Sequence, residues 1–210
     1  MLYSIVIAIV TLFTKIFYRH KIYGQIHIQP GAAILASNHV SYLDPPLLSI
    51  SCPDKVFFLA RKTLFKGWFG KLIYALNSRP VSSGTANLQM FREISALLEQ
   101  GKKIILFPEG TRSQDGNLGQ IKPGIFLLFH RTHCAIQPAY IAGSFSIWGR
   151  ERRWPKFFGK TACIFGSPLL WERYEKTPRR EAEAQLAEDL RNAILSLKEW
   201  YEAGAKGTPP

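Results

Sequence analysis

The chain has 210 residues, of which 47% are hydrophobic and 20% are charged. This composition excludes a disordered segment and a polytopic membrane protein and fits a single globular domain. Its 27 basic and 15 acidic side chains give a formal net charge of +12, so we expect an anionic partner: a nucleic acid, an anionic membrane surface or a phosphorylated small molecule.

The first 18 residues are strongly apolar. Their least interrupted stretch, residues 2–13, would reach about 18 Å as a helix, which is short of the roughly 30 Å hydrocarbon core of a bilayer. We therefore expect residues 1–22 to form a peripheral, monotopic membrane-associating segment at the cytoplasmic face, with a buried first helix or a marginal single span as alternatives. Basic residues that suit anionic headgroups follow the apolar stretch: Lys15, Arg19, His20 and Lys21.

Beyond this segment, short apolar runs alternate with longer amphipathic ones, a pattern typical of an α/β domain. The amphipathic runs 85–100 and 178–202 predict helices. We expect one domain over residues 23–202, a mixed β-sheet flanked by helices, followed by a frayed tail over residues 203–210. The apolar runs predict buried strands: 34–37, 56–60, 104–107, 136–141 and 161–165.

His39 and Asp44 follow the predicted strand 34–37, and ligands bind at this end of the strands in α/β sheets. Because Pro45 favours a helix that begins at Asp44, the turn between the two residues can bring the carboxylate to one imidazole nitrogen. That contact fixes the tautomer and raises the basicity of the other nitrogen, as a general base requires. The alternative is that Asp44 only caps a helix beside a loop histidine.

A second polar segment, Phe-Pro-Glu-Gly-Thr-Arg at residues 107–112, follows the predicted strand 104–107. Gly110 allows close approach of the backbone, Thr111 supplies a hydroxyl group, and Arg112 offers a planar fork that suits phosphate oxygens. Phosphate binding is one interpretation. A solvated turn in which Glu109 pairs with Arg112 is the other.

Taken together, the two segments resemble the lysophosphatidate (1-acylglycerol-3-phosphate) acyltransferase family of glycerolipid acyltransferases. The resemblance covers about residues 25–166. It implies that Asn-His-Val-Ser-Tyr-Leu-Asp, residues 38–44, is the catalytic His-x4-Asp block and that residues 107–112 form the acceptor-phosphate block. The second block makes the resemblance specific, because a chance match of six consecutive residues is rarer than a chance match of two spaced residues.

Three further stretches are similar to family blocks. Residues 60–64 resemble Ala-Lys-x-Glu-Leu, with Arg61 in place of the lysine and Thr63 in place of the glutamate. Residues 76–79 retain Arg79 but have Ser78 where the family block has aspartate. Residues 136–143 resemble the fourth block, a strand that contains a proline.

The resemblance implies transfer of a fatty acyl group from an acyl thioester, either acyl-CoA or acyl carrier protein, to the free hydroxyl of lysophosphatidate, which gives phosphatidate. His39 would take the hydroxyl proton and Asp44 would orient it. We expect no cofactor and no metal, and the acceptor could instead be glycerol-3-phosphate or another lysophospholipid. The expected substrate-binding residues are Arg61, Arg79, Glu109, Gly110, Thr111 and Arg112.

Two segments, residues 64–71 and 148–158, interleave aromatic and basic side chains, which suits the headgroup region of a membrane with anionic lipid or, alternatively, surface loops.

A nucleic-acid-binding module would explain the charge but not the two strand-end segments, so we expect no nucleic-acid partner. A metal-dependent phosphatase could use His39 and Asp44 as ligands, but no His/Asp cluster has convincing spacing. Cys52, Cys134 and Cys163 lack disulfide or metal spacing and predict a reducing compartment.

Overall fold

The described part of this computed structural model, residues 2–81 and 88–210, contains one seven-stranded mixed sheet. The strand order is β1-β7-β6-β2-β5-β3-β4. Neighbouring strands pair in parallel except β6 and β7, which are antiparallel. The strands are β1 (Lys21–Tyr23), β2 (Ala33–Ser37), β3 (Val56–Arg61), β4 (Ser78–Val81), β5 (Lys103–Leu106), β6 (Ala135–Ala142) and β7 (Ala162–Phe165).

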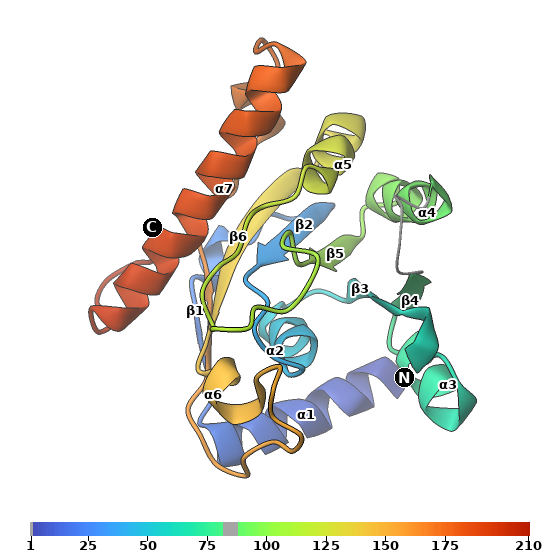
Figure 1. Cartoon of the computed structure of the whole chain (residues 1–210), viewed down its shortest axis with the longest axis vertical. Helices are drawn as coiled ribbons and strands as arrows, with labels where there is room; N and C mark the ends of the chain where they lie inside the picture. The colour runs from blue at the N-terminus through green and yellow to red at the C-terminus, as the bar shows by residue number, and fades with distance from the viewer. Residues whose placement is uncertain (1, 82–87) are drawn as a thin grey trace.

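Helices cover both faces of the sheet (Figure 1). Ile34 and Ala36 of β2 pack in the cluster that includes side chains of α4, α5 and α7. Leu35, which points the opposite way, packs with α2 and with apolar side chains of α1. The helices are α1 (Leu2–Tyr18), α2 (Asp44–Ser51), α3 (Gly67–Ala75), α4 (Leu88–Glu99), α5 (Gly124–Thr132), α6 (Ser144–Trp148) and α7 (Arg179–Glu202).

The predicted α/β domain with a mixed sheet between helices is confirmed, and the five predicted strands correspond to β2, β3, β5, β6 and β7. The prediction missed β1 and β4, the two edge strands. Both are short, and β4 contains Pro80, so neither carries the continuous apolar run of a strand buried on both faces. Residues 85–87 of the predicted helix 85–100 lie outside the described part.

The predicted boundary between residues 22 and 23 falls inside β1, which pairs with β7. His20 was expected to meet headgroups, and this is wrong because the side chain is buried. Its Nδ1 atom lies 2.8 Å from the Thr161 hydroxyl and its Nε2 atom 2.9 Å from the Ser51 hydroxyl. Within the described residues, no helix combines the length and apolarity that a membrane crossing requires.

The C-terminal residues 203–210 were expected to fray, and the structure corrects this. The Ser167 N–H donates to the Pro210 carbonyl at 3.1 Å, and the Trp200 indole N–H donates to the Lys206 carbonyl at 3.0 Å. Pro209 is buried. One long-range hydrogen bond therefore holds this end against the chain that follows β7, and a local one holds it against α7. No local sequence pattern indicates the long-range contact.

Burial lowers the pKa of His20 to about 4. Between that value and the unfolded pKa near 6.5, only the unfolded chain binds the proton, so stability is present above pH 6.5 and falls as the pH drops toward 4. We predict that lowering the pH from 7 to 5 costs the wild type about 2 kcal/mol more than it costs His20→Asn. Urea unfolding of both proteins at both pH values measures this difference; identical pH dependence would contradict the prediction.

Candidate active site

The two polar segments predicted from the sequence meet at one edge of the sheet. β2 and β5 are adjacent and parallel, so the residues that follow them, His39 and residues 107–112, emerge side by side. The Ser113 N–H donates to the His39 carbonyl at 2.7 Å. The His39 ring stacks on Phe107, with centroids 3.9 Å apart and an interplanar angle of 15°. These contacts bring the two predicted segments together, and their role as one active site stays a prediction.

The His39 Nδ1 atom lies 2.9 Å from Asp44 Oδ2. Because a carboxylate only accepts hydrogen bonds, Nδ1 carries the proton in the neutral ring and the Nε2 lone pair is left for another partner. Within the described residues, no hydrogen bond involves His39 Nε2, and the side chain is 17% exposed. The ring can therefore take a proton from a bound molecule.

Asp44 is fully buried at the first residue of α2. Besides His39, its carboxylate accepts the N–H groups of Val40 and Ser41, both at 2.7 Å, and the Ser144 hydroxyl at 2.7 Å. Four donors thus surround one carboxylate, which satisfies a charge that would otherwise be costly to bury. The Asp44-Pro45 pair begins a helix as predicted, and the same carboxylate holds the turn that carries His39.

The Ser41 hydroxyl, two residues from His39, is not available as a nucleophile. It donates to the Trp148 carbonyl at 2.8 Å and accepts the Leu43 N–H at 3.1 Å. All three cysteines are free and buried, and burial raises the pKa of the thiols of Cys52 and Cys134. The geometry at His39 therefore suits proton removal from a substrate hydroxyl rather than an acyl-enzyme.

Glu109 connects the two segments. Its Oε1 atom accepts the His39 N–H at 2.8 Å and its Oε2 atom accepts the Gly119 N–H at 2.8 Å. Burial raises the pKa of the Glu109 carboxyl, and the hydrogen bonds from the two N–H groups partly oppose this. The alternative in which Glu109 pairs with Arg112 in a solvated turn is wrong, because the two carboxylate oxygens accept backbone N–H groups instead. Glu109 thus fixes the backbone of His39, and its expected role as a substrate-binding residue stays a prediction.

Arg112 lies over the ring of Tyr42, with its Cζ atom 3.5 Å from the centroid. Its Nη1 atom is buried and has no hydrogen-bond acceptor among the residues that the structure describes. A buried donor without an acceptor is uncommon and points to a missing partner, which for a guanidinium is an anion. Gly110 adopts a left-handed φ of +70°, which favours glycine at this turn. Thr111 is exposed next to it.

The remaining two predicted binding residues lie further along the sheet. Arg61 ends β3, next to β5, and is exposed. Arg79 lies on the edge strand β4, two strands from β5 and thus about 10 Å away. Its Cζ atom is 4.7 Å from the Tyr74 ring centroid and 5.2 Å from that of Phe57. The structure therefore does not group Arg79 with residues 107–112.

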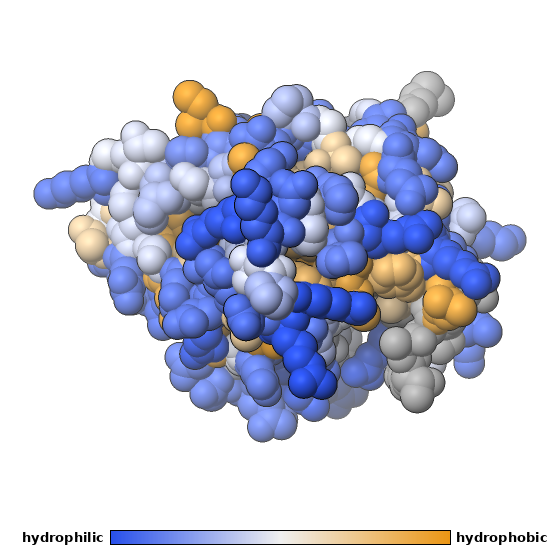
Figure 2. Space-filling view, turned by 90° about the horizontal axis from the view of Figure 1, so that it is seen from above, coloured by the Kyte–Doolittle hydropathy of each residue, from blue (hydrophilic) through white to orange (hydrophobic). Residues whose placement is uncertain are grey.

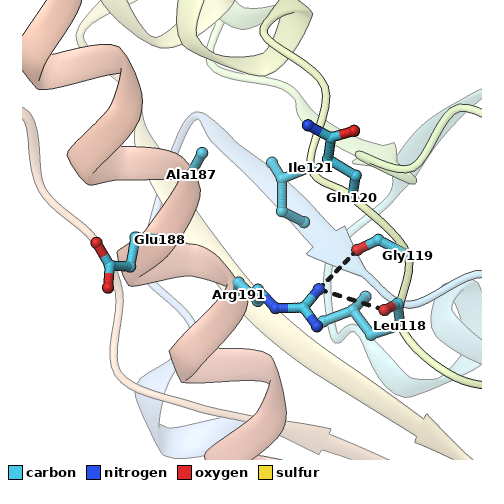
Figure 3. A pocket seen from close by; sticks show the side chains of 7 residues that line it. All are labelled: Leu118, Gly119, Gln120, Ile121, Ala187, Glu188 and Arg191. Atoms are coloured by element: carbon cyan, nitrogen blue, oxygen red, sulfur yellow. Dashed lines mark hydrogen bonds between the residues drawn. The ribbon is translucent and has the colours of Figure 1, made fainter.

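An open pocket of about 530 Å³ adjoins the Glu109 contact (Figure 3). On one side of it, the Arg191 guanidinium of α7 donates to the carbonyls of Leu118 and Gly119, at 3.3 and 2.9 Å. Gly119 is also the residue whose N–H meets Glu109. Neither His39 nor Arg112 lines this pocket. The hydrogen bonds of Arg191 stabilise the loop whose Gly119 N–H binds Glu109.

Among the described residues, no group of three or more His, Cys, Asp or Glu is arranged to hold a metal ion.

A family model described as Acyltransferase matches residues 19–142, which is more than half of the chain and includes both His39 and Arg112. The chain belongs to this acyltransferase family. The resemblance seen in the sequence is thereby confirmed at the level of the family.

Individual relatives agree with this assignment. The chloroplastic 1-acyl-sn-glycerol-3-phosphate acyltransferase of Arabidopsis thaliana is 30% identical over 83% of this chain and 50% of its own length. The Bacillus subtilis enzyme of the same name is 25% identical over 85% of this chain and 87% of its own. The chain thus spans only half of the Arabidopsis relative. The crystal structure of a 1-acyl-sn-glycerophosphate acyltransferase from Thermotoga maritima has the same fold, with a TM-score of 0.74 and 23% identity over 93% of this chain and 81% of its own.

Sequence reasoning missed several residues that build the site. Asn38 accepts the Ile141 N–H at 2.8 Å and donates to its carbonyl at 3.1 Å, which extends the pairing of β2 with β6. Ser144 and Tyr42 were given no role, although they contact Asp44 and Arg112. Position directly after a strand was a usable signal for Asn38. No sequence signal joins Ser144 to Asp44.

We predict that Glu109→Ala lowers the free energy of unfolding by about 2 to 4 kcal/mol, because it removes two hydrogen bonds to a charged acceptor. Urea unfolding measures the change. Glu188→Ala is the matched control: this glutamate of α7 is exposed, and its loss should change stability by no more than about 0.5 kcal/mol. Equal stability of the two variants would show that Glu109 does not brace the site.

Proposed function

We propose that the protein is a 1-acylglycerol-3-phosphate acyltransferase that uses an acyl thioester, acyl-CoA or acyl carrier protein, and produces phosphatidate for phospholipid synthesis. The observation that carries this proposal is the contact between the two segments at one sheet edge. The Ser113 N–H, next to Arg112, donates to the His39 carbonyl, and neither His39 Nε2 nor the buried Arg112 Nη1 has a hydrogen-bond partner among the described residues. The names of the relatives from Arabidopsis and Bacillus support the same substrate.

In the proposed reaction, His39 Nε2 takes the proton of the acceptor hydroxyl as the oxygen attacks the thioester carbonyl carbon. The new C–O bond forms, the C–S bond breaks, and the thiolate leaves with the proton that the imidazolium returns. Asp44 stabilises the imidazolium through Nδ1. Arg112 holds the acceptor phosphate, so that the hydroxyl is presented to His39 rather than found by diffusion.

Both substrates carry acyl chains that prefer a bilayer, so the site must be reached from a membrane surface. We propose that the protein binds the membrane through a surface that we call the apolar face, built from α1 and the loop of residues 149–160. The loop joins α1 directly: the Gly159 N–H donates to the Phe17 carbonyl at 3.1 Å. The exposed side chains of the apolar face are Leu2, Ile5, Ile9, Leu12, Phe13, Ile16, Trp154, Phe157 and Phe158.

The apolar face borders the proposed active site. Ser41, in the turn after His39, forms a β-bridge with Gly149, and the Arg150 guanidinium donates to the Arg112 carbonyl at 3.2 Å. Exposed basic residues in the same loop, Arg152, Arg153 and Lys156, suit anionic headgroups. In Figure 2, the side of the molecule away from α1 is dominated by hydrophilic side chains. A contiguous apolar surface on one side and a polar one opposite favour interfacial binding.

We predict that His39→Ala lowers kcat for transfer to lysophosphatidate by about 10² to 10⁴-fold or more, because the general base is lost. The assay offers labelled acyl-CoA and acyl carrier protein to lysophosphatidate, glycerol-3-phosphate and other lysophospholipids. His130→Ala, which removes an exposed imidazole of α5, should keep wild-type turnover. Wild-type turnover in His39→Ala would contradict the role of His39 as general base. A wild type that transfers no acyl group to lysophosphatidate would contradict the proposed function.

We predict that the wild type floats with vesicles containing anionic lipid, and that the double variant Phe157→Ser, Phe158→Ser binds them at least about tenfold more weakly, since two largely exposed aromatic rings are lost. Ile26→Ser is the matched control, because this apolar side chain is 88% exposed. Ile26 follows β1, which runs antiparallel to β2. It therefore lies at the end of the sheet opposite to the residues that follow β2. Equal and negligible flotation of the wild type with anionic and neutral vesicles would reject membrane binding through this face.

A further inference from the structure

Lys122, which had no role in the sequence-based predictions, lies over the turn at Gly110 in the proposed phosphate-binding segment. A Cβ atom built on Gly110 would lie 3.0 Å from Lys122 Nζ and 3.2 Å from its Cδ atom. The lysine side chain therefore lies across the backbone of Gly110. Its own backbone is fixed to the same segment, because the Lys122 N–H donates to the Pro108 carbonyl at 2.9 Å.

The Lys122 ammonium group has no partner of its own in the parts of the chain that the structure describes. Neither a hydrogen bond nor an ion pair involves Nζ there, and the side chain is exposed. The carboxylate of residues 107–112, Glu109, is engaged by two backbone N–H groups. A second cationic group with free donors thus adjoins the same turn as the buried Nη1 of Arg112.

Arg79, one of the expected substrate-binding residues, is in a different position. It lies two strands from β5, its guanidinium packs over Tyr74 and Phe57, and its Nη1 donates to the Ser78 carbonyl at 3.1 Å. Its aromatic contacts hold it at the sheet edge. Of the two residues, Lys122 is the one that the structure places against residues 107–112.

We propose that Lys122 is a substrate-binding residue that, with Arg112, selects a phosphate monoester as the acyl acceptor. This inference rests on the proposed function and deepens it. A phosphate monoester carries a charge between −1.5 and −2 at neutral pH, which two cations match, whereas a phosphodiester headgroup carries a single negative charge. A turn with two cations therefore favours lysophosphatidate or glycerol-3-phosphate over lysophospholipids whose phosphate is esterified twice.

The test compares Lys122→Gln, Lys122→Arg and the wild type in steady-state kinetics with lysophosphatidate. Lys122→Gln should raise the acceptor KM about tenfold, the factor expected from one charge-assisted hydrogen bond, with kcat and the donor KM unchanged. Lys122→Arg should restore most of the affinity. Lys102→Gln is the matched control, because Lys102 is exposed at the other end of β5. An acceptor KM within twofold of the wild type in Lys122→Gln would overturn the proposal.

A binding measurement separates this proposal from the proposed function. An NMR titration with inorganic phosphate, in the absence of any acyl donor, follows the backbone amides of residues 107–112. Weaker binding by Lys122→Gln than by the wild type and Lys102→Gln would support a phosphate role for Lys122 even if the wild type transferred no acyl group. Equal phosphate binding by all three proteins would overturn the role of Lys122 while leaving acyl transfer to lysophosphatidate intact.

Discussion

The Asp44 carboxylate is fully buried, and a charge in that position is tolerated only because four donors surround it. Those donors come from the turn that follows β2, from the His39 ring and from Ser144 after β6. Each bond that stabilises the charge also restrains the group that donates it. The position and tautomer of the His39 ring and the start of α2 depend on this carboxylate, which also helps to attach α6.

A second buried carboxylate, Glu109, plays a comparable part between the two segments of the site. It accepts N–H groups from the turn after β2 and from the loop near Gly119, which Arg191 holds from α7. The reacting ring and the phosphate turn are thereby fixed to each other through backbone rather than through flexible side chains. Such an arrangement leaves donors on Arg112 and Lys122 without a partner among the described residues, as pre-organisation for the proposed phosphate ligand would require.

The parts of the fold that the sequence predicted well are those with a strong local signal. Runs such as residues 34–36 are apolar at every position because both sheet faces are covered, and α7 shows a helical apolar stripe. Short edge strands lack that signal, so β1 and β4 were missed. His20 was predicted to meet headgroups because basic residues that follow an apolar helix often lie at a membrane interface. In the structure it is buried and hydrogen-bonded to hydroxyl groups from two distant segments.

The amino-acid sequence by itself determined which chemical groups follow β2 and β5: an imidazole with a carboxylate five residues later, and a glycine turn with an arginine. Tertiary structure alone decided the partners. His39 meets Glu109 across 70 residues and Asp44 meets Ser144 across 100, while Lys122 rather than Arg79 lies against Gly110. The reason is physical: strand and helix preferences arise between near neighbours in the chain, but a hydrogen bond or ion contact depends on distances that only the order of strands in the sheet establishes.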